Sequence, residues 1–104
     1  MNRESKLDYI AAKVSQTSRL MQVAEECAEL VQAAAKMARI KAGDNPAAVS
    51  RDEALRSLVE EIADVRNAID ALRLDDVLPS GAVEEVQRAK LERWFERVKL
   101  AGKR

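Results

Sequence analysis

The sequence predicts an all-α protein, and three observations lead to this prediction. The chain has 104 residues with one Trp, one Tyr and one Phe, which are few aromatic side chains for a β-sheet. It has only 3 Gly and 2 Pro, so few residues interrupt a helix. Apolar residues recur at alternating spacings of three and four, which is the helical period. We therefore expect a four-helix bundle built on a central antiparallel helical hairpin and completed by oligomerisation, as a single domain over residues 1–104.

The first two helices follow from their start and stop signals. The first is short and covers residues 7–14. The serine-containing segment 15–18 then offers a break and an N-cap. The second helix covers about residues 18–41 and ends at Gly43 and Pro46.

The other two helices also have recognisable boundaries. The third begins at a capping box, in which Ser50 and Glu53 satisfy each other's backbone N–H groups, and extends to about Leu74. A proline then breaks the chain, and Ser80 is expected to cap the fourth helix, over residues 82–100.

The two long helices each carry an apolar stripe. The first stripe comprises Leu20, Val23, Cys27, Leu30, Ala34 and Met37. The second comprises Leu55, Leu58, Ile62, Val65, Ile69 and Leu72. Because the connection is short, we expect these helices to form an antiparallel hairpin. Further apolar residues widen the first stripe to about half the helix circumference, so the fourth helix or a second subunit should cover the rest.

Composition excludes several classes of function. Lys plus Arg and Asp plus Glu are each 18, so the net charge is zero and no nucleic-acid or membrane partner is expected. The single cysteine, Cys27, cannot form an internal disulfide, which favours a cytoplasmic protein. No apolar run is long enough to span a bilayer, and the N-terminal stretch lacks the apolar core of a signal peptide. With no histidine, the commonest general base and transition-metal ligand is missing.

One acidic pattern occurs twice, once on each long helix. VAEECAEL covers residues 23–30, and LVEEIADV covers residues 58–65. Both have the order apolar, apolar, Glu-Glu, apolar, Ala, acid, apolar. At 1.5 Å rise per residue, an antiparallel hairpin brings the two copies within roughly one helical turn of the same level. Carboxylates from both helices could then share one divalent cation.

Helical geometry separates these acids. At 100° per residue, Glu26 lies roughly 70° from the centre of its apolar stripe, and Glu61 takes the same position on the third helix. Glu25 and Glu60 point away from the seam between the helices. Acids on a helix are most often solvated surface residues. Here, however, Glu25 and Glu29 are a like-charge i,i+4 pair that repels unless a cation lies nearby, and the second copy repeats this spacing.

The ligand type indicates the metal. Carboxylate oxygens suit Mg²⁺ or Mn²⁺ and argue against zinc. A ferritin-like di-iron bundle needs Glu-x-x-His steps, which a chain without histidine cannot supply.

The motif Glu25-Glu26-x-x-Glu29, followed by Glu61-x-x-Asp64, resembles the EExxE…ExxD signature of the all-α nucleoside triphosphate pyrophosphohydrolases, the MazG-like family. The surrounding sequence resembles the small stand-alone and phage-type members. The resemblance covers residues 18–74, and the fourth helix matches more loosely.

This resemblance implies a hydrolase that cleaves nucleoside triphosphates to the monophosphate and pyrophosphate, with Mg²⁺ as cofactor and Mn²⁺ able to substitute. It implies a homodimer or homotetramer. Its metal ligands would be Glu26, Glu29, Glu61 and Asp64. Glu25 would then orient the attacking water or support the ligands.

Three further side chains are candidates for binding substrate. Asn67 lies one turn beyond Asp64 and could hydrogen-bond a sugar or base. Lys90 and Arg93 could contact phosphates and belong to the loose match of the fourth helix, although Lys and Arg are more often ordinary surface charges. Two alternatives stay open: an enzyme acting on phosphoribosyl-ATP, and a non-catalytic helical interaction module.

Overall fold

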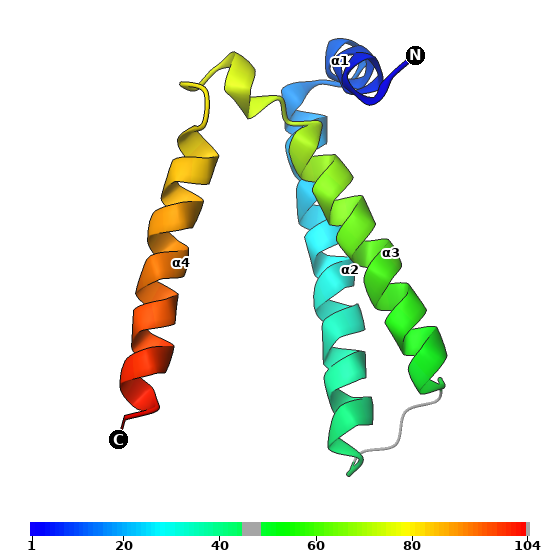
Figure 1. Ribbon diagram of the computed structural model, residues 1–104. Helices are drawn as coiled ribbons and strands as arrows, with labels where there is room; N and C mark the ends of the chain where they lie inside the picture. The colour runs from blue at the N-terminus through cyan, green and yellow to red at the C-terminus, as the bar shows by residue number, and fades with distance from the viewer. Residues whose placement is uncertain (45–48, 104) are drawn as a thin grey trace. The chain divides into compact units, whose positions relative to one another are not determined.

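The computed structural model describes residues 1–44 and 49–103. These residues form four α-helices and one 3₁₀ turn, with no β-strand among them (Figure 1). The elements are α1 (Arg3–Lys13), α2 (Gln16–Ala42), α3 (Arg51–Asp70), η1 (Leu74–Asp76) and α4 (Ala82–Ala101). The all-α prediction is confirmed. The chain divides into two compact units, Met1–Arg73 and Leu74–Arg104. That the whole chain acts as one domain stays a prediction.

The first unit is organised by the packing of α2 against α3, which run antiparallel (Figure 1). Three of the most buried residues in this unit are alanines: Ala33 is 8% exposed, Ala54 1% and Ala68 6%. Small side chains let two helix axes approach closely. The larger Met37, 7% exposed, fills space beside them.

The buried face of α2 differs from the predicted stripe. Leu20 is 52% exposed and Ala34 is exposed, whereas Ala33 is buried in its place. The buried face of α2 is therefore rotated toward Glu26. At 100° per residue, Glu26 lies within roughly 30° of the centre of the buried face, closer than the roughly 70° predicted from the apolar stripe. Glu26 is accordingly half-buried.

The buried face of α3 is rotated in a corresponding way. Leu55 is 46% exposed and Ile69 is 44% exposed, while Ala54 and Ala68 occupy the seam. The predicted stripe followed the largest apolar side chains, but close approach to α2 selects the small ones. As a result Glu61 is also half-buried.

The ends of α2 follow from local capping. The Ser15 hydroxyl accepts a hydrogen bond from the Ser18 N–H at 3.1 Å, so the helix starts two residues earlier than predicted. Gly43 ends the helix in the left-handed conformation, with φ 75°, and its N–H bonds to the Arg39 carbonyl. Pro46, predicted to reinforce this end, lies outside the described residues.

The start of α3 matches half of the predicted capping box, and its end does not match the predicted boundary. The Ser50 hydroxyl accepts a hydrogen bond from the Glu53 N–H at 3.2 Å, but among the described residues no bond returns from the Glu53 side chain to the Ser50 N–H. The helix ends at Asp70, before the predicted Leu74. Arg19 of α2 explains this early end, because its Nη1 donates to the carbonyl oxygens of Ala71 at 3.0 Å and Leu72 at 2.9 Å. Because the guanidinium satisfies these two carbonyl oxygens, they do not need N–H donors from a further turn of helix.

The helix α1 begins earlier than the predicted residue 7, because the Asn2 side chain accepts from the Ser5 N–H at 2.8 Å and caps it. Ion pairs join α1 to the end of α3. Arg73 contacts Glu4 at 2.6 Å and Asp8 at 2.8 Å. Together with the burial of Leu7, these contacts attach α1 to the hairpin.

In the second unit, α4 starts differently from the prediction. Gly81, with φ 80°, occupies the N-cap position, and no side chain caps this end, so the predicted Ser80 cap is wrong. A positive φ favours glycine, which has no Cβ to clash. The chain can therefore enter the helix through a backbone turn without a hydroxyl cap.

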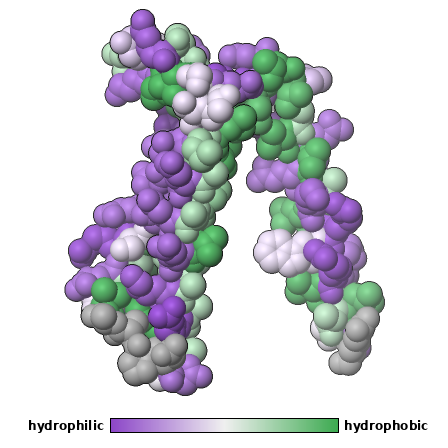
Figure 2. Space-filling model, turned by 180° about the vertical axis from the view of Figure 1, so that it is seen from behind, coloured by the Kyte–Doolittle hydropathy of each residue, from purple (hydrophilic) through white to green (hydrophobic). Residues whose placement is uncertain are grey.

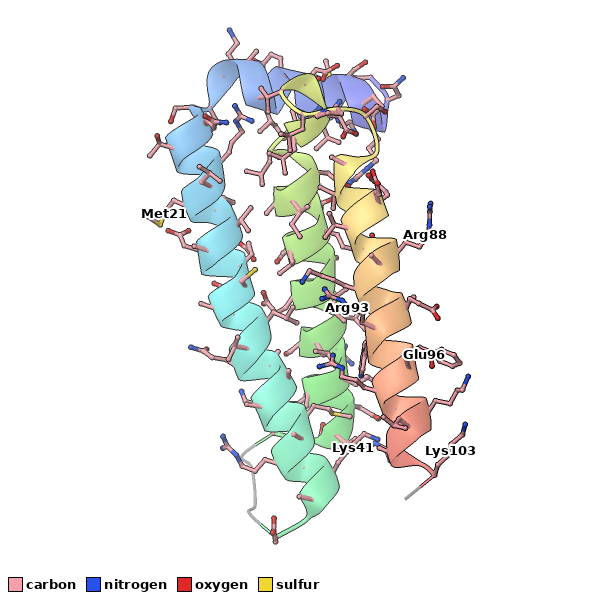
Figure 3. All side chains as sticks on the ribbon, turned by 90° about the vertical axis from the view of Figure 1, so that its left-hand side faces the viewer. Met21, Lys41, Arg88, Arg93, Glu96 and Lys103 are labelled. Carbon is pink, nitrogen blue, oxygen red and sulfur yellow. The ribbon has the colours of Figure 1, made fainter. Side chains whose placement is uncertain are left out.

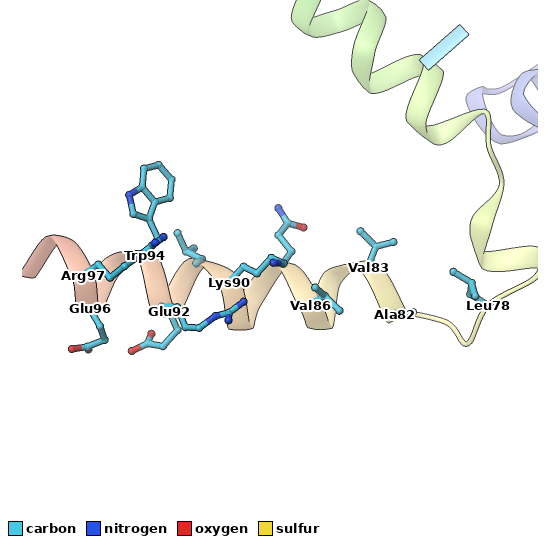
Figure 4. Close-up of a pocket in the computed structure, with 12 residues that line it drawn as sticks. Leu78, Ala82, Val83, Val86, Lys90, Glu92, Trp94, Glu96 and Arg97 are labelled. Atoms are coloured by element: carbon cyan, nitrogen blue, oxygen red, sulfur yellow. The ribbon is translucent and has the colours of Figure 1, made fainter. Parts of the chain in front are cut away.

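The helix α4 exposes much of its apolar surface, and no residue of it is buried. Trp94 is 61% exposed and Val98 60%. Residues of α4 and Leu78 line an open hollow, in which Trp94 projects from one side of the helix and Glu92 and Glu96 from another (Figure 4). Apolar side chains are visible on the molecular surface among hydrophilic ones (Figure 2). No helix within the described residues is long and apolar enough to cross a membrane.

The role of Arg19 can be tested by replacing it with lysine. Arg19→Lys keeps the charge but loses the planar group that also donates from Nε to the Val14 carbonyl at 3.0 Å. We expect the free energy of unfolding to fall by about 1.5–3 kcal/mol, the value of hydrogen bonds to a charged group. Urea denaturation followed by circular dichroism measures this change.

The matched control is Arg66→Lys, at an exposed position of α3. We expect it to change the stability by less than about 0.5 kcal/mol. Equal effects of the two substitutions would show that Arg19 does not hold the end of α3.

Candidate metal centre

The structure brings together four of the predicted site residues, two from α2 and two from α3. One carboxylate oxygen from each lies within 4.8 Å of the corresponding oxygen of every other. We call this group the carboxylate cluster; its members are Glu26, Glu29, Glu61 and Asp64. The spacing of three residues on each helix places both acids of a pair on neighbouring turns of one face. Antiparallel packing then sets the two pairs opposite each other.

The cluster has a buried half and an open half. Glu26 and Glu61 are half-buried in the seam between the helices, whereas Glu29 and Asp64 are exposed. The Oε2 atoms of Glu26 and Glu61 are buried and have no hydrogen-bond partner among the described residues. A buried acceptor without a partner is energetically costly, and a bound ion is one way of satisfying it.

The surroundings of the cluster make the charged form of two carboxylates unfavourable. Burial is the first cause that raises the pKa of Glu26 above 4.5, and the charges of Glu29 and Asp64 raise it further. A hydrogen bond from Gln22 partly opposes this rise. Burial also raises the pKa of Glu61, and the neighbouring carboxylates of Glu29, Asp64 and Glu26 raise it further. None of the ion pairs within residues 1–44 and 49–103 involves the cluster.

The donor set fits a hard divalent cation. All four donors are carboxylate oxygens, the ligands that Mg²⁺ and Mn²⁺ prefer. A cation would supply both a partner for the two buried oxygens and the positive charge that the site lacks. The residues present therefore fit the metal that the resemblance implies. Cys27, which follows Glu26 in the sequence and is half-buried, offers only a single thiol as a further ligand.

The other predicted site residues lie outside the cluster. Glu25 is exposed, and the structure does not place it with the four carboxylates. The amide oxygen of Asn67 accepts a hydrogen bond from Arg3 Nη1 at 3.0 Å, so part of its side chain is engaged by α1. Lys90 (Figure 4) and Arg93 (Figure 3) project from α4, in the second unit. Their roles stay predictions.

Sequence reasoning missed one residue beside the cluster. Gln22 Nε2 donates a hydrogen bond to Glu26 Oε1 at 2.8 Å. The sequence contains the spacing that indicates this hydrogen bond, because a donor and an acid four residues apart on a helix lie on the same face.

Comparison of the chain with protein-family models, with curated proteins and with solved structures finds no match in any of the three. The resemblance to the MazG-like family therefore depends on the motif residues alone and stays a prediction.

The raised pKa values predict how the metal-free protein responds to pH. Because folding raises the pKa of Glu26 and Glu61 above 4.5, the folded state binds their protons more tightly than the unfolded state. Their contribution to stability is complete at low pH and is lost as pH rises from about 4.5 through the raised values. We expect the melting temperature in EDTA to fall over this window.

A double substitution isolates this contribution. Glu26→Gln with Glu61→Gln should flatten the pH dependence, since neither amide titrates. The matched control, Glu25→Gln with Glu60→Gln, removes the same number of charges at exposed positions and should retain the pH dependence of the melting temperature. Thermal melts followed by circular dichroism give the comparison; equal slopes in the two variants would contradict the assignment.

Proposed function

We propose that this protein is a Mg²⁺-dependent nucleoside triphosphate pyrophosphohydrolase, which cleaves the bond between the α- and β-phosphates and releases pyrophosphate. The observation that carries the proposal is the carboxylate cluster, with four acids from two helices and two buried oxygens without partners among the described residues. The same four positions are the ones that the motif resemblance to the MazG-like family marks as ligands.

The two halves of the cluster suit different tasks in this reaction. Glu26 and Glu61 would hold the ion from the seam between the helices. Glu29 and Asp64 would hold it from the solvent side, where a triphosphate can approach. Bound Mg²⁺ or Mn²⁺ would supply positive charge for the phosphate oxygens and make water a better nucleophile. Without that charge, the four acids would repel the substrate.

The remaining residues would position substrate and water. We assign to Glu25 the orientation of the attacking water or the support of the ligands. A carboxylate can accept the proton of that water, so the reaction does not need histidine. The amide group of Asn67 would hydrogen-bond the sugar or base. The motif resemblance also marks Lys90 and Arg93 as candidates for phosphate contacts, since both side chains carry hydrogen-bond donors and a positive charge suited to anions.

The proposal predicts which carboxylates are needed for activity. Glu26→Gln and Asp64→Asn should each reduce pyrophosphate release by more than about a hundredfold, because even the supporting partners of metal ligands are worth tenfold to hundredfold. Glu60→Gln, at an exposed position next to Glu61, serves as the control and should remain active. The measurement is pyrophosphate release from a panel of NTPs and dNTPs with Mg²⁺.

The same panel, extended with phosphoribosyl-ATP, separates the alternatives. Cleavage of phosphoribosyl-ATP in preference to every nucleoside triphosphate would favour the related enzyme. No cleavage, together with no rise in melting temperature on adding Mg²⁺, would favour an interaction module, because a ligand that binds only the folded state must stabilise it.

We also propose that the protein works as a homo-oligomer, either a dimer or a tetramer. Apolar side chains remain exposed on both units: Val31 of α2 is 67% exposed, and Met21, 58% exposed, projects from α2 away from α3 (Figure 3). On α4, Trp94 and Val98 lie one turn apart and are similarly exposed. Contiguous exposed apolar surface is typical of an interface between subunits.

Replacing part of this surface with charge tests the proposal. Trp94→Glu combined with Val98→Glu should shift the protein toward the monomer, while the helix persists because glutamate is a good helix former. Sedimentation equilibrium measures the mass. Arg88→Gln with Arg97→Gln, on the same helix, lowers the net charge by the same two units and is the control for the change in charge. A monomeric wild-type protein would contradict the oligomer.

A further inference from the structure

Gln22 is the only neutral side chain among the described residues that hydrogen-bonds a member of the carboxylate cluster. It lies one turn before Glu26 on α2, and its Nε2 donates to Glu26 Oε1 at 2.8 Å. The other oxygen of the same carboxylate, Oε2, is the one that is buried without a partner. The hydrogen bond therefore restrains the Glu26 carboxylate through Oε1 and leaves Oε2 as the oxygen available in the seam.

The second copy of the motif lacks this support. Glu61 takes the place of Glu26 on α3, and the residue one turn before it is Ser57. No hydrogen bond within the described parts of the chain joins Ser57 to Glu61. A serine side chain is also too short to imitate the extended amide of glutamine. Two carboxylates with equivalent positions and similar burial thus differ in how firmly they are oriented.

We infer that Gln22 is a positioning residue, which preorganises Glu26 as the fixed ligand of a divalent cation while Glu61 adapts to it. This inference rests on the proposed metal-dependent function of the cluster. Partners that orient a ligand through its second oxygen or nitrogen contribute to metal affinity because they remove freedom that binding would otherwise cost.

The amide is chemically suited to this task. A lysine or arginine at position 22 would orient the carboxylate equally well, but its charge would oppose a cation in the site. A glutamate would add a fifth acid and no donor. Glutamine donates a hydrogen bond and adds no net charge, so it orients Glu26 without weakening the attraction of the cluster for a cation.

The test is a Mn²⁺ titration followed by electron paramagnetic resonance of the free ion. Gln22→Met keeps the length and helix preference of the side chain but removes the donor. We expect its Kd for Mn²⁺ to rise at least about tenfold, at the lower end of the range for such partners. We expect kcat at saturating Mn²⁺ to stay within about twofold, because the ion occupies the same ligands once it is bound.

Two controls separate positioning from a merely structural role. Gln87→Met makes the same change at an exposed position on α4, in the second unit, and should leave the Kd unchanged. The melting temperature of metal-free Gln22→Met should match that of the Gln87→Met protein. A lowered melting temperature with an unchanged Kd would mean that Gln22 only stabilises the helix.

The outcomes distinguish this inference from the function on which it rests. If the wild-type protein binds no Mn²⁺, the proposed metal site itself is wrong. If the wild-type protein binds Mn²⁺ and cleaves a nucleoside triphosphate, but Gln22→Met binds Mn²⁺ within about threefold of the wild type, the site stands and the positioning role is wrong.

Discussion

The close packing of α2 against α3 is the constraint on which the rest of the structure depends. Alanines at the seam, among them Ala33 and Ala54, let the helices approach, and the rotation that buries them also draws Glu26 and Glu61 into the interface. Burial and neighbouring acids then raise the pKa of both carboxyl groups. The fold therefore holds two carboxylates where the charged form is unfavourable, and a bound cation would relieve that cost.

The polar contacts at one end of the hairpin keep this geometry in place. Arg19, seven residues before Glu26 on α2, bonds the carbonyls that follow α3, and Arg73 ties the same region to α1. These contacts oppose sliding of one helix along the other. The level of the two acidic pairs is thus set jointly by the seam and by this end of the hairpin, since a shift of one turn would separate the pairs by about 5.4 Å.

Much of this architecture could be predicted from sequence, because helical periodicity and capping are local signals. The helices, the Ser50 cap and the meeting of the four acids all follow from spacing. The rotation of the seam could not be predicted, because periodicity favours large residues such as Leu55, while close approach selects Ala54. The end of α3 depends on Arg19, which is distant in sequence. The bond from Gln22 depends on side-chain orientation, which spacing permits but does not determine.

Anomalous diffraction from a crystal soaked with Mn²⁺ is the most direct test of a metal site in the carboxylate cluster. We expect an anomalous peak between α2 and α3, coordinated by oxygens of the cluster at about 2.0–2.3 Å, the range of oxygen ligands around small divalent cations. The buried Oε2 atoms of Glu26 and Glu61 should be among those ligands. A peak located elsewhere on the chain, with the cluster left without density, would contradict the proposed metal site.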